Sequence, residues 1–354
     1  MAAADTQLLE FSCPICFEHF GDIEPKLLPR CGHSLCVECI GKMKLNGKVV
    51  CPSCRQENVI PLVLPTNYAL KSAAEASKVL LVGGRKSKDK IQVYCPDELS
   101  ANCVLQTRLR GLRSGHVAGL LGFRLFVCGG QNGFRSDSTD ILNIGTDLWR
   151  QGPRMIKRRL SATGLVVSNR FFVFGGDQER TSEMFYPEID SWIPIAAPPG
   201  HCRLPVSASC SVAFDQKIYV LGGLTDDWED NCALAYDPVG GCWLGRAGSN
   251  MRCHRSGAAA AAFNSTIIVT GGQSNQGKAL IASEMLDPRC GSWISICPML
   301  EPRWSHQLVD CGGHLLAMGG TDSRTVEEFD ARMSKWLKAE PLLEETWSSA
   351  AVVL

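Results

Sequence analysis

The chain has 354 residues, with 36 Lys and Arg against 36 Asp and Glu, so its formal net charge is zero. This balance gives no whole-chain attraction to nucleic acid or to an anionic membrane. The N-terminus "MAAADTQLLEF" lacks the basic start and apolar core of a signal peptide, and no run approaches the roughly eighteen apolar residues of a membrane span. We therefore expect two or three soluble domains in the cytoplasm or nucleus, with no nucleic-acid and no membrane partner.

The cysteines are distributed unevenly along the chain. Eleven of the eighteen are scattered from Cys95 to Cys311, mostly in apolar strand-like runs, and we interpret them as reduced core thiols. The other seven combine with one histidine into ligand pairs at short spacing. Each tetrahedral zinc needs two such pairs, so four pairs predict two closed sites without an open position for a catalytic water. The pairs are Cys13 and Cys16, Cys31 and His33, Cys36 and Cys39, and Cys51 and Cys54.

This ligand order, with the histidine fourth, resembles the RING finger over residues 13–54. The resemblance implies a cross-brace, in which the first and third pairs hold one zinc ion and the second and fourth pairs hold the other. His19, three residues after Cys16, is a competing ligand, but His33 already fills the family's histidine position. A segment this short has little core, so zinc binding would supply most of its folding free energy.

RING fingers similar to this one act as ubiquitin ligases without a nucleophile of their own. They bind a ubiquitin-conjugating enzyme that carries ubiquitin as a thioester. The resemblance implies a shallow apolar groove for that enzyme at Ile15, Met43 and Pro52. It also places Arg55 as a linchpin, whose five donors could bridge the enzyme and ubiquitin and hold the ubiquitin ready for attack. The alternative is a zinc module that acts only as a scaffold.

The segments that flank the finger, "QLLEFSCPIC" and "LPTNYALKSAAEASK", resemble the edges of tripartite-motif RING fingers. The flanking helices of those proteins often pair two fingers, so a RING dimer is an open alternative here. The absence of a B-box and a coiled coil after the finger argues against it. We expect the finger and its flanks over residues 1–64 and a short linker or helix over residues 65–77.

Beyond residue 77 an apolar run that ends in Gly-Gly occurs six times, with successive first glycines 46 to 49 residues apart. In five repeats a tryptophan follows, seven residues after an apolar residue. We interpret each repeat as a four-stranded antiparallel sheet, in which the glycines end the second strand and the tryptophan packs adjacent sheets together. The pattern resembles the kelch repeat, which implies a mostly β chain with a six-bladed β-propeller over residues 78–354.

The end of the sequence predicts how this ring closes. Repeats two to six each have a first strand before the apolar run, whereas repeat one has none because the finger and its linker precede it directly. The tail "SSAAVVL" matches those first strands. We therefore predict that it supplies the missing strand of blade one and joins the two ends of the propeller.

Four repeats carry an arginine sixteen residues before the first glycine, at Arg113, Arg159, Arg255 and Arg303. By resemblance to kelch substrate adaptors, these residues could form a basic rim that binds an acidic peptide of a protein substrate. The alternative is that they cap strand ends or bridge blades.

Together the two modules predict a single-chain RING-type ubiquitin ligase, a transferase without a covalent intermediate of its own. The rival hypothesis is a zinc-containing interaction scaffold. A copper-oxidase propeller is not supported, because the scattered histidines lack ligand-pair spacing. A Cys/His hydrolase is not supported either, because nothing marks one thiol as activated.

Overall fold

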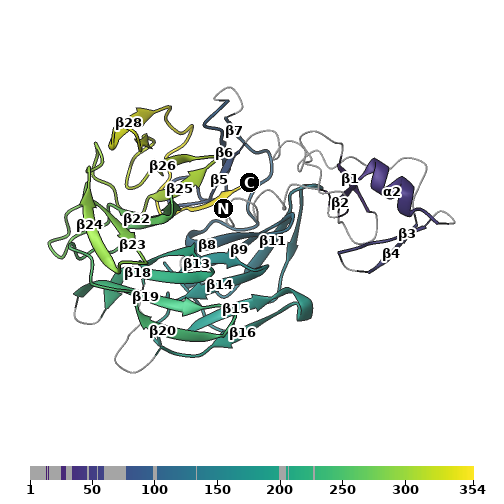
Figure 1. The fold of residues 1–354 in the computed structure, drawn as a ribbon, viewed down its shortest axis with the longest axis horizontal. Coiled ribbons are helices and arrows are strands. Elements are labelled where there is room, and N and C mark those ends of the chain that lie inside the picture. The colour runs from purple at the N-terminus through teal and green to yellow at the C-terminus, as the bar shows by residue number, and fades with distance from the viewer. Residues whose placement is uncertain are drawn as a thin grey trace. The chain divides into compact units, whose positions relative to one another are not determined.

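The computed structural model describes residues 13, 15, 25–28, 34–45, 48–53, 55–59, 77–98, 102–132, 134–198, 205, 207–225 and 228–354. The chain divides into two compact units, residues 1–77 with 144–146 and residues 78–143 with 147–354 (Figure 1). Every helix in the described ranges is too short or too polar to cross a membrane.

The described residues of the smaller unit form two short hairpins and one helix. The helix α2 (Val37–Met43) follows directly on the first hairpin, because Cys36 ends its second strand and also caps the helix. Cys39 and Ile40 are the buried residues of this helix, so its packed face is the one that carries the cysteine. The strands are β1 (Pro25–Leu27) paired with β2 (Ser34–Cys36), and β3 (Lys48–Val50) paired with β4 (Glu57–Val59).

The larger unit is a propeller of six antiparallel sheets, as the described strands define them. Blades two to six each follow the chain from the centre outward, whereas the first strand of blade one is β29, from the other end of the unit. The first strands of neighbouring sheets contact one another all the way round, which closes the ring. Blade one is β29 (Ala350–Val353), β5 (Val79–Val82), β6 (Ile91–Tyr94) and β7 (Cys103–Val104); blade two is β8 (Ser114–Leu121), β9 (Arg124–Asn132), β11 (Thr139–Asn143) and β12 (Leu148–Gln151), with β10 (Phe134–Arg135) added beside β9. Blade three is β13 (Thr163–Val167), β14 (Arg170–Phe174), β15 (Ser182–Tyr186), the short helix η2 (Pro187–Ile189) and β16 (Ser191–Ile195); blade four is β17 (Cys210–Phe214), β18 (Lys217–Thr225), β19 (Trp228–Asp237) and β20 (Cys242–Arg246). Blade five is β21 (Ala259–Phe263), β22 (Thr266–Thr270), β23 (Ser283–Asp287) and β24 (Ser292–Ile296); blade six is β25 (Gln307–Cys311), β26 (His314–Met318), β27 (Val326–Asp330) and β28 (Lys335–Ala339).

The glycine pairs are needed both for their backbone angles and for close approach. All twelve of these glycines have positive φ, which side chains with a Cβ adopt only at a cost. At Gly176 a Cβ would lie 2.6 Å from the Cβ of Ala162, on the next chain segment inward. At Gly84 it would lie 2.9 Å from the carbonyl oxygen of Trp347. The predicted close contact at the glycines is therefore confirmed. The second strand ends directly before the glycine pair in blades one, three, five and six, whereas β9 and β18 continue through it to Asn132 and Thr225, so the prediction that the glycines end the strand is wrong for blades two and four.

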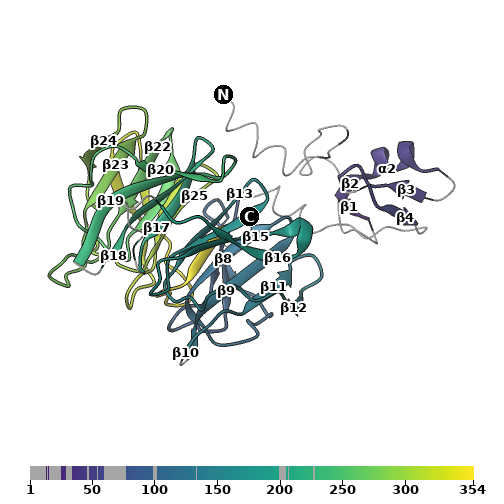
Figure 2. The ribbon, with the colours of Figure 1, turned by 90° about the horizontal axis from the view of Figure 1, so that it is seen from below.

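The repeated tryptophans join neighbouring blades. Each is the cross-strand partner of the apolar residue seven positions earlier, as Phe185 pairs with Trp192. Four of the indole N–H groups donate to the segment between their blade and the preceding one, as Nε1 of Trp243 does to the carbonyl oxygen of Ala196 at 2.8 Å. Nε1 of Trp293 is buried without a hydrogen-bond partner among the described residues. The apolar clusters combine residues of adjacent sheets, such as Phe126 of blade two with Trp192 of blade three. Figures 1 and 2 show these neighbouring sheets lying face to face, as the pattern predicted.

The C-terminal strand completes blade one, as the tail sequence predicted. β29 pairs antiparallel with β5, from Ala350 opposite Val82 to Val353 opposite Val79, and is the yellow strand beside β5 in Figure 1. The N–H of Leu354 continues the ladder by donating to the carbonyl oxygen of Lys78 at 2.8 Å. The inner edge of β5, which has no strand directly before it in the sequence, is thus paired by β29.

Side chains reinforce this seam between blades one and six. The hydroxyl of Tyr94 donates to the carbonyl oxygen of Glu340 at 3.1 Å, and burial raises the pKa of Tyr94 to about 12. His314 lies between Glu328 at 2.7 Å and Asp97 of blade one at 3.0 Å. The hydrogen bond to Glu328 raises the pKa of His314, so the imidazole keeps its charge to a higher pH than a free histidine does.

Deletion of residues 348–354 should destabilise the propeller markedly. The cut removes β29 and exposes the edge of β5, whose four side chains are at most 2% exposed. An open apolar edge of this kind also promotes aggregation. We expect a lower melting temperature of the propeller by calorimetry, together with light scattering on heating. The control variant Leu343→Ser replaces an exposed side chain just before the closing strand, and its propeller should melt at the same temperature as that of the unmodified protein. Equal melting of the truncated and intact proteins would contradict closure by this strand.

Candidate functional site

Three predicted zinc ligands come together in the smaller unit. The Sγ atoms of Cys13, Cys36 and Cys39 all lie within 4.8 Å of one another, and all three side chains are buried. The hairpin and the first turn of α2 position two of them. The backbone N–H of Cys39 points at Sγ of Cys36 at 3.3 Å, and that of Cys36 points at Sγ of Cys13 at 3.5 Å. Such N–H donors favour the thiolate, the form that binds metal.

This cluster fits a tetrahedral zinc ion. With zinc–sulfur bonds of about 2.3 Å, two ligands of one ion lie roughly 3.8 Å apart, which three sulfurs within 4.8 Å of one another can satisfy with small movements. Buried thiolates without a cation would pay a large desolvation cost, so the same geometry argues for a bound metal. Cys16, the fourth ligand predicted for this site, lies outside the described residues.

The second predicted site is described only at Cys51, because Cys31, His33 and Cys54 lie outside the described residues. Cys51 is fully buried. Its N–H donates to the carbonyl oxygen of Gln56 at 2.9 Å, and its own carbonyl accepts from the N–H of Arg55 at 2.8 Å. These bonds form a tight turn between β3 and β4 that holds Cys51 inside the unit. The number of zinc ions therefore stays a prediction.

The residues predicted to contact a conjugating enzyme are accessible. Ile15 is 39% exposed. Pro52 and Arg55 are exposed and Met43 is half-buried at the end of α2. Arg55 has a positive φ of 59°, so it sits in the left-handed region as the turn from Cys51 enters β4. Accessibility is what the groove and linchpin need, and their binding role stays a prediction.

The four repeated arginines lie inside the blades. Their side chains are 0 to 8% exposed, and each pairs at 2.5 to 2.9 Å with a buried carboxylate of the third strand. Each also donates to the carbonyl oxygen of the first glycine of its repeat. The pairs are Arg113 with Asp140, Arg159 with Glu183, Arg255 with Glu284, and Arg303 with Glu327. These contacts fit the structural alternative and leave no guanidinium free for a basic rim.

The sequence carries a signal for this pairing that the search for arginines alone misses. In the same four repeats an acidic residue stands nine positions before the tryptophan. Blade four has Val206 in place of the arginine and Leu234 in place of the acid, so both charges are replaced together. At the seam, Thr346 and Gln92 occupy these positions, and the Gln92 amide hydrogen-bonds the backbone of Glu344. The charges thus occur together or not at all, as a buried pair requires.

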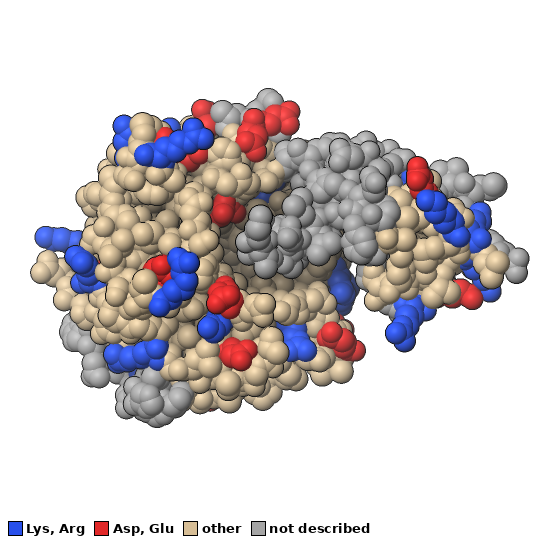
Figure 3. All heavy atoms as spheres, viewed as in Figure 1, with Lys and Arg blue, Asp and Glu red and all other residues tan. Residues whose placement is uncertain are grey.

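Basic and acidic side chains are interspersed over the propeller face that Figure 3 shows. With zero net charge over the chain, this pattern gives little long-range steering toward a polyanion. Recognition by the propeller must therefore rest on local groups of side chains.

The fold and the cysteine cluster define a protein that combines a RING-type zinc finger with a kelch propeller. Residues 13–52 match the RING-type zinc-finger family, and residues 115–320 match the KLHDC2/KLHL20/DRC7 Kelch-repeats domain. The chain belongs to the kelch-repeat family, and the finger match, with the cluster, indicates zinc binding.

Similar proteins share the repeats. Alpha-scruin of Limulus polyphemus is 26% identical over 261 residues, which cover 67% of this chain and 28% of that protein. Kelch-like protein 23 of Mus musculus is 29% identical over 203 residues, or 55% of this chain and 34% of that protein. An F-box/kelch-repeat protein of Arabidopsis thaliana is 29% identical over 126 residues, 34% of this chain and 32% of its own length. The chain thus spans about a third or less of the length of these relatives.

The buried pairs can be tested by borrowing the residues of blade four. Arg303→Val leaves Glu327 buried without its cation and should cost about 3–5 kcal/mol of unfolding free energy. The double variant Arg303→Val, Glu327→Leu removes both charges and should recover part of this loss. Recovery is incomplete because Glu327 also accepts the N–H groups of Leu300 and Glu301. Urea unfolding measures both variants. A double variant no more stable than the single one would refute the structural assignment.

Metal content tests the finger. The purified protein should contain two zinc ions per chain, and Cys36→Ser should lose at least one of them, because this residue is both a ligand and the cap of α2. Inductively coupled plasma mass spectrometry gives the count, and the melting of the propeller, a separate unit, should be unchanged. Cys242→Ser, at an exposed propeller cysteine, is the control and should retain all zinc. One ion or none in the unmodified protein would refute the cross-brace.

Proposed function

We propose that this protein is a RING-type ubiquitin ligase, in which the finger recruits a ubiquitin-loaded conjugating enzyme and the propeller holds a protein substrate. The observation that carries the proposal is the union, in one chain, of a cysteine cluster fit for zinc with a closed kelch propeller. The exposed Ile15 and Arg55 are available for contact with a partner, as a binding surface on the finger requires.

In this mechanism the chain acts by positioning. Zinc, when bound, supplies the rigidity of the loops around its ligands. Ile15 offers an apolar contact to the conjugating enzyme, and Met43 and Pro52 extend that groove. Arg55 holds the enzyme and ubiquitin together through its five N–H donors, which confines the thioester to an attack-ready pose. The attacking lysine comes from the substrate bound to the propeller, so no nucleophile of this chain takes part.

The proposal places the protein in the cytoplasm or the nucleus. Thiolate ligands such as Cys13 and Cys36 must stay reduced to hold zinc, and these compartments keep thiols reduced. Conjugating enzymes that carry ubiquitin as a thioester need the same conditions.

Single-turnover discharge of ubiquitin from a panel of conjugating enzymes tests this function. Arg55→Ala and Ile15→Ala should slow discharge by about 10- to 100-fold, the effect of losing contacts worth about 1.5–3 kcal/mol in the transition state. Both variants should retain zinc, because neither residue is a ligand. Val59→Ala changes an exposed residue of β4 outside the groove and should discharge at the normal rate.

Two results would count against the proposal. Full activity of both variants with a competent enzyme would show that the groove and linchpin are misplaced. No discharge with any enzyme of a broad panel, by a zinc-loaded protein, would favour the interaction scaffold instead.

A further inference from the structure

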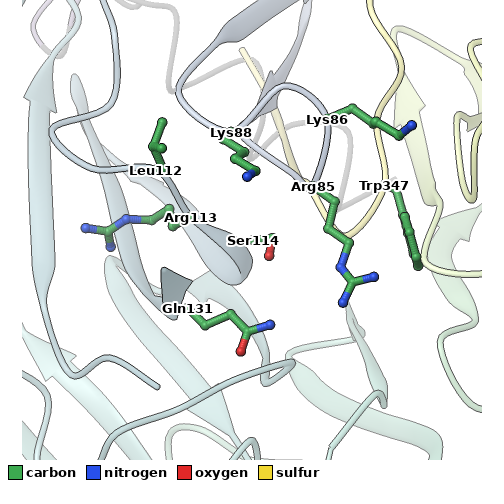
Figure 4. A pocket seen from close by; sticks show the side chains of 8 residues that line it. All are labelled: Arg85, Lys86, Lys88, Leu112, Arg113, Ser114, Gln131 and Trp347. Atoms are coloured by element: carbon green, nitrogen blue, oxygen red, sulfur yellow. The ribbon is translucent and has the colours of Figure 1, made fainter. Parts of the chain in front are cut away.

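A pocket of about 440 Å³ opens on the propeller beside the seam that the C-terminal strand closes (Figure 4). Its walls come from the β5–β6 loop of blade one, the start of β8, the end of β9 and the residues just before β29. Four of its eight lining residues are cationic and none is acidic. The lining residues are Arg85, Lys86, Lys88, Leu112, Arg113, Ser114, Gln131 and Trp347.

Two of these cations have no counter-charge. Arg113 is neutralised by Asp140, and Lys86 lies near Asp322 at 3.5 Å and Glu345 at 3.8 Å. In the part of the chain that the structure describes, Arg85 and Lys88 form no ion pair. Figure 4 shows both side chains directed into the pocket, above Ser114 and Gln131. Like charges gathered without a partner are unfavourable unless a ligand supplies the opposite charge.

Arg85 is held in place before any ligand arrives. Its backbone N–H donates to the carbonyl oxygen of Trp347 at 2.7 Å, and its guanidinium carbon lies 4.4 Å from the centre of the Trp347 ring. Trp304 supports that ring edge to face at 5.4 Å. The hydroxyl of Ser87 also ties the loop to the carbonyl oxygen of Glu345 at 2.7 Å. A guanidinium stacked on an indole keeps its N–H edge free for two parallel bonds to a carboxylate or phosphate.

A second pocket, formed by blades two and three, is lined by both cationic and acidic side chains. It is lined by Arg135, Lys157 and Arg158, but also by Asp177 and Glu179. Lys157 pairs there with Glu179 at 2.7 Å. The seam pocket therefore differs from this second pocket in having no acidic residue among its described lining residues.

We infer that the seam pocket binds an acidic side chain, bearing a carboxylate or a phosphate, of a protein held by the propeller. The inference rests on the proposed substrate-binding role of the propeller. The volume admits a side chain with its flanking backbone, and Leu112, 43% exposed, offers an apolar contact beside the cations. The mixed charge of the propeller face in Figure 3 disfavours an extended polyanion such as a nucleic acid there.

Peptide selection on the intact protein tests this site. Two random peptide libraries are used, one with Asp and Glu and one that also contains phosphoserine, both acetylated and amidated so that only side chains carry charge. We expect acidic residues to be enriched, and the two libraries distinguish carboxylate from phosphate as the preferred group. No enrichment, or enrichment of neutral or basic residues, overturns the inference.

Affinity measurements with the best selected peptide locate the site. By fluorescence polarisation, Arg85→Glu with Lys88→Glu should weaken binding roughly tenfold or more, and added salt should weaken binding to the unmodified protein. Lys88→Glu alone changes an exposed side chain without packing and should also weaken binding, which guards against a folding defect at Arg85. Arg158→Glu makes the same charge change in the second pocket, so it is the matched control and should bind the peptide normally. Equal binding by the Lys88 variant and the control overturns the site.

These measurements need no conjugating enzyme, so failure of the pocket and failure of the ligase are separate results. The Lys88 variant should discharge ubiquitin at the normal rate, because the residue lies in the propeller and outside the proposed finger groove. Loss of peptide binding with normal discharge is the expected combination.

Discussion

Four blades of the propeller each depend on a buried arginine whose charge is neutralised by a buried carboxylate. Breaking such a pair leaves a charge without water or a partner, so the carboxylate and the carbonyl acceptors must stay in place. In each blade the arginine joins the start of the first strand, the glycine turn after the second and the acid of the third. The interaction that fixes the blade also withdraws its arginine from any partner. Recognition must then come from residues on the loops.

The seam departs from this arrangement, and its surface differs accordingly. There Thr346 and Gln92 replace the charged pair, and neutral hydrogen bonds join Gln92 to the segment before the closing strand. Positive charge appears instead on the β5–β6 loop, where Arg85 stacks on Trp347 and Lys88 faces the same pocket. The blade completed by two distant parts of the chain thus carries, on its β5–β6 loop, two cations that form no ion pair among the described residues.

The blades could be predicted from the sequence because their signals are local and periodic. Each repeat has a glycine pair at a turn, a tryptophan that packs against the adjacent sheet, and a nearly fixed spacing between the two. The closing strand could be predicted because blade one was one strand short. The sequence did not settle the role of Arg113 or Arg303, since distance along the chain does not say whether a side chain enters the channel or the sheet. The seam pocket could not be predicted from the sequence, because Arg85 and Trp347 are far apart in the chain and come into contact only when the ring closes.

That dependence has a consequence for synthesis of the protein. Blades two to six can form in order as their strands leave the ribosome, because each is built from consecutive residues. Blade one must wait with three strands until Val353 has emerged, and only then does Trp347 come to rest under Arg85. The finger, translated long before, can fold around metal in the meantime. Chains halted before Val353 has emerged would carry a folded finger together with a propeller whose blade one lacks its first strand.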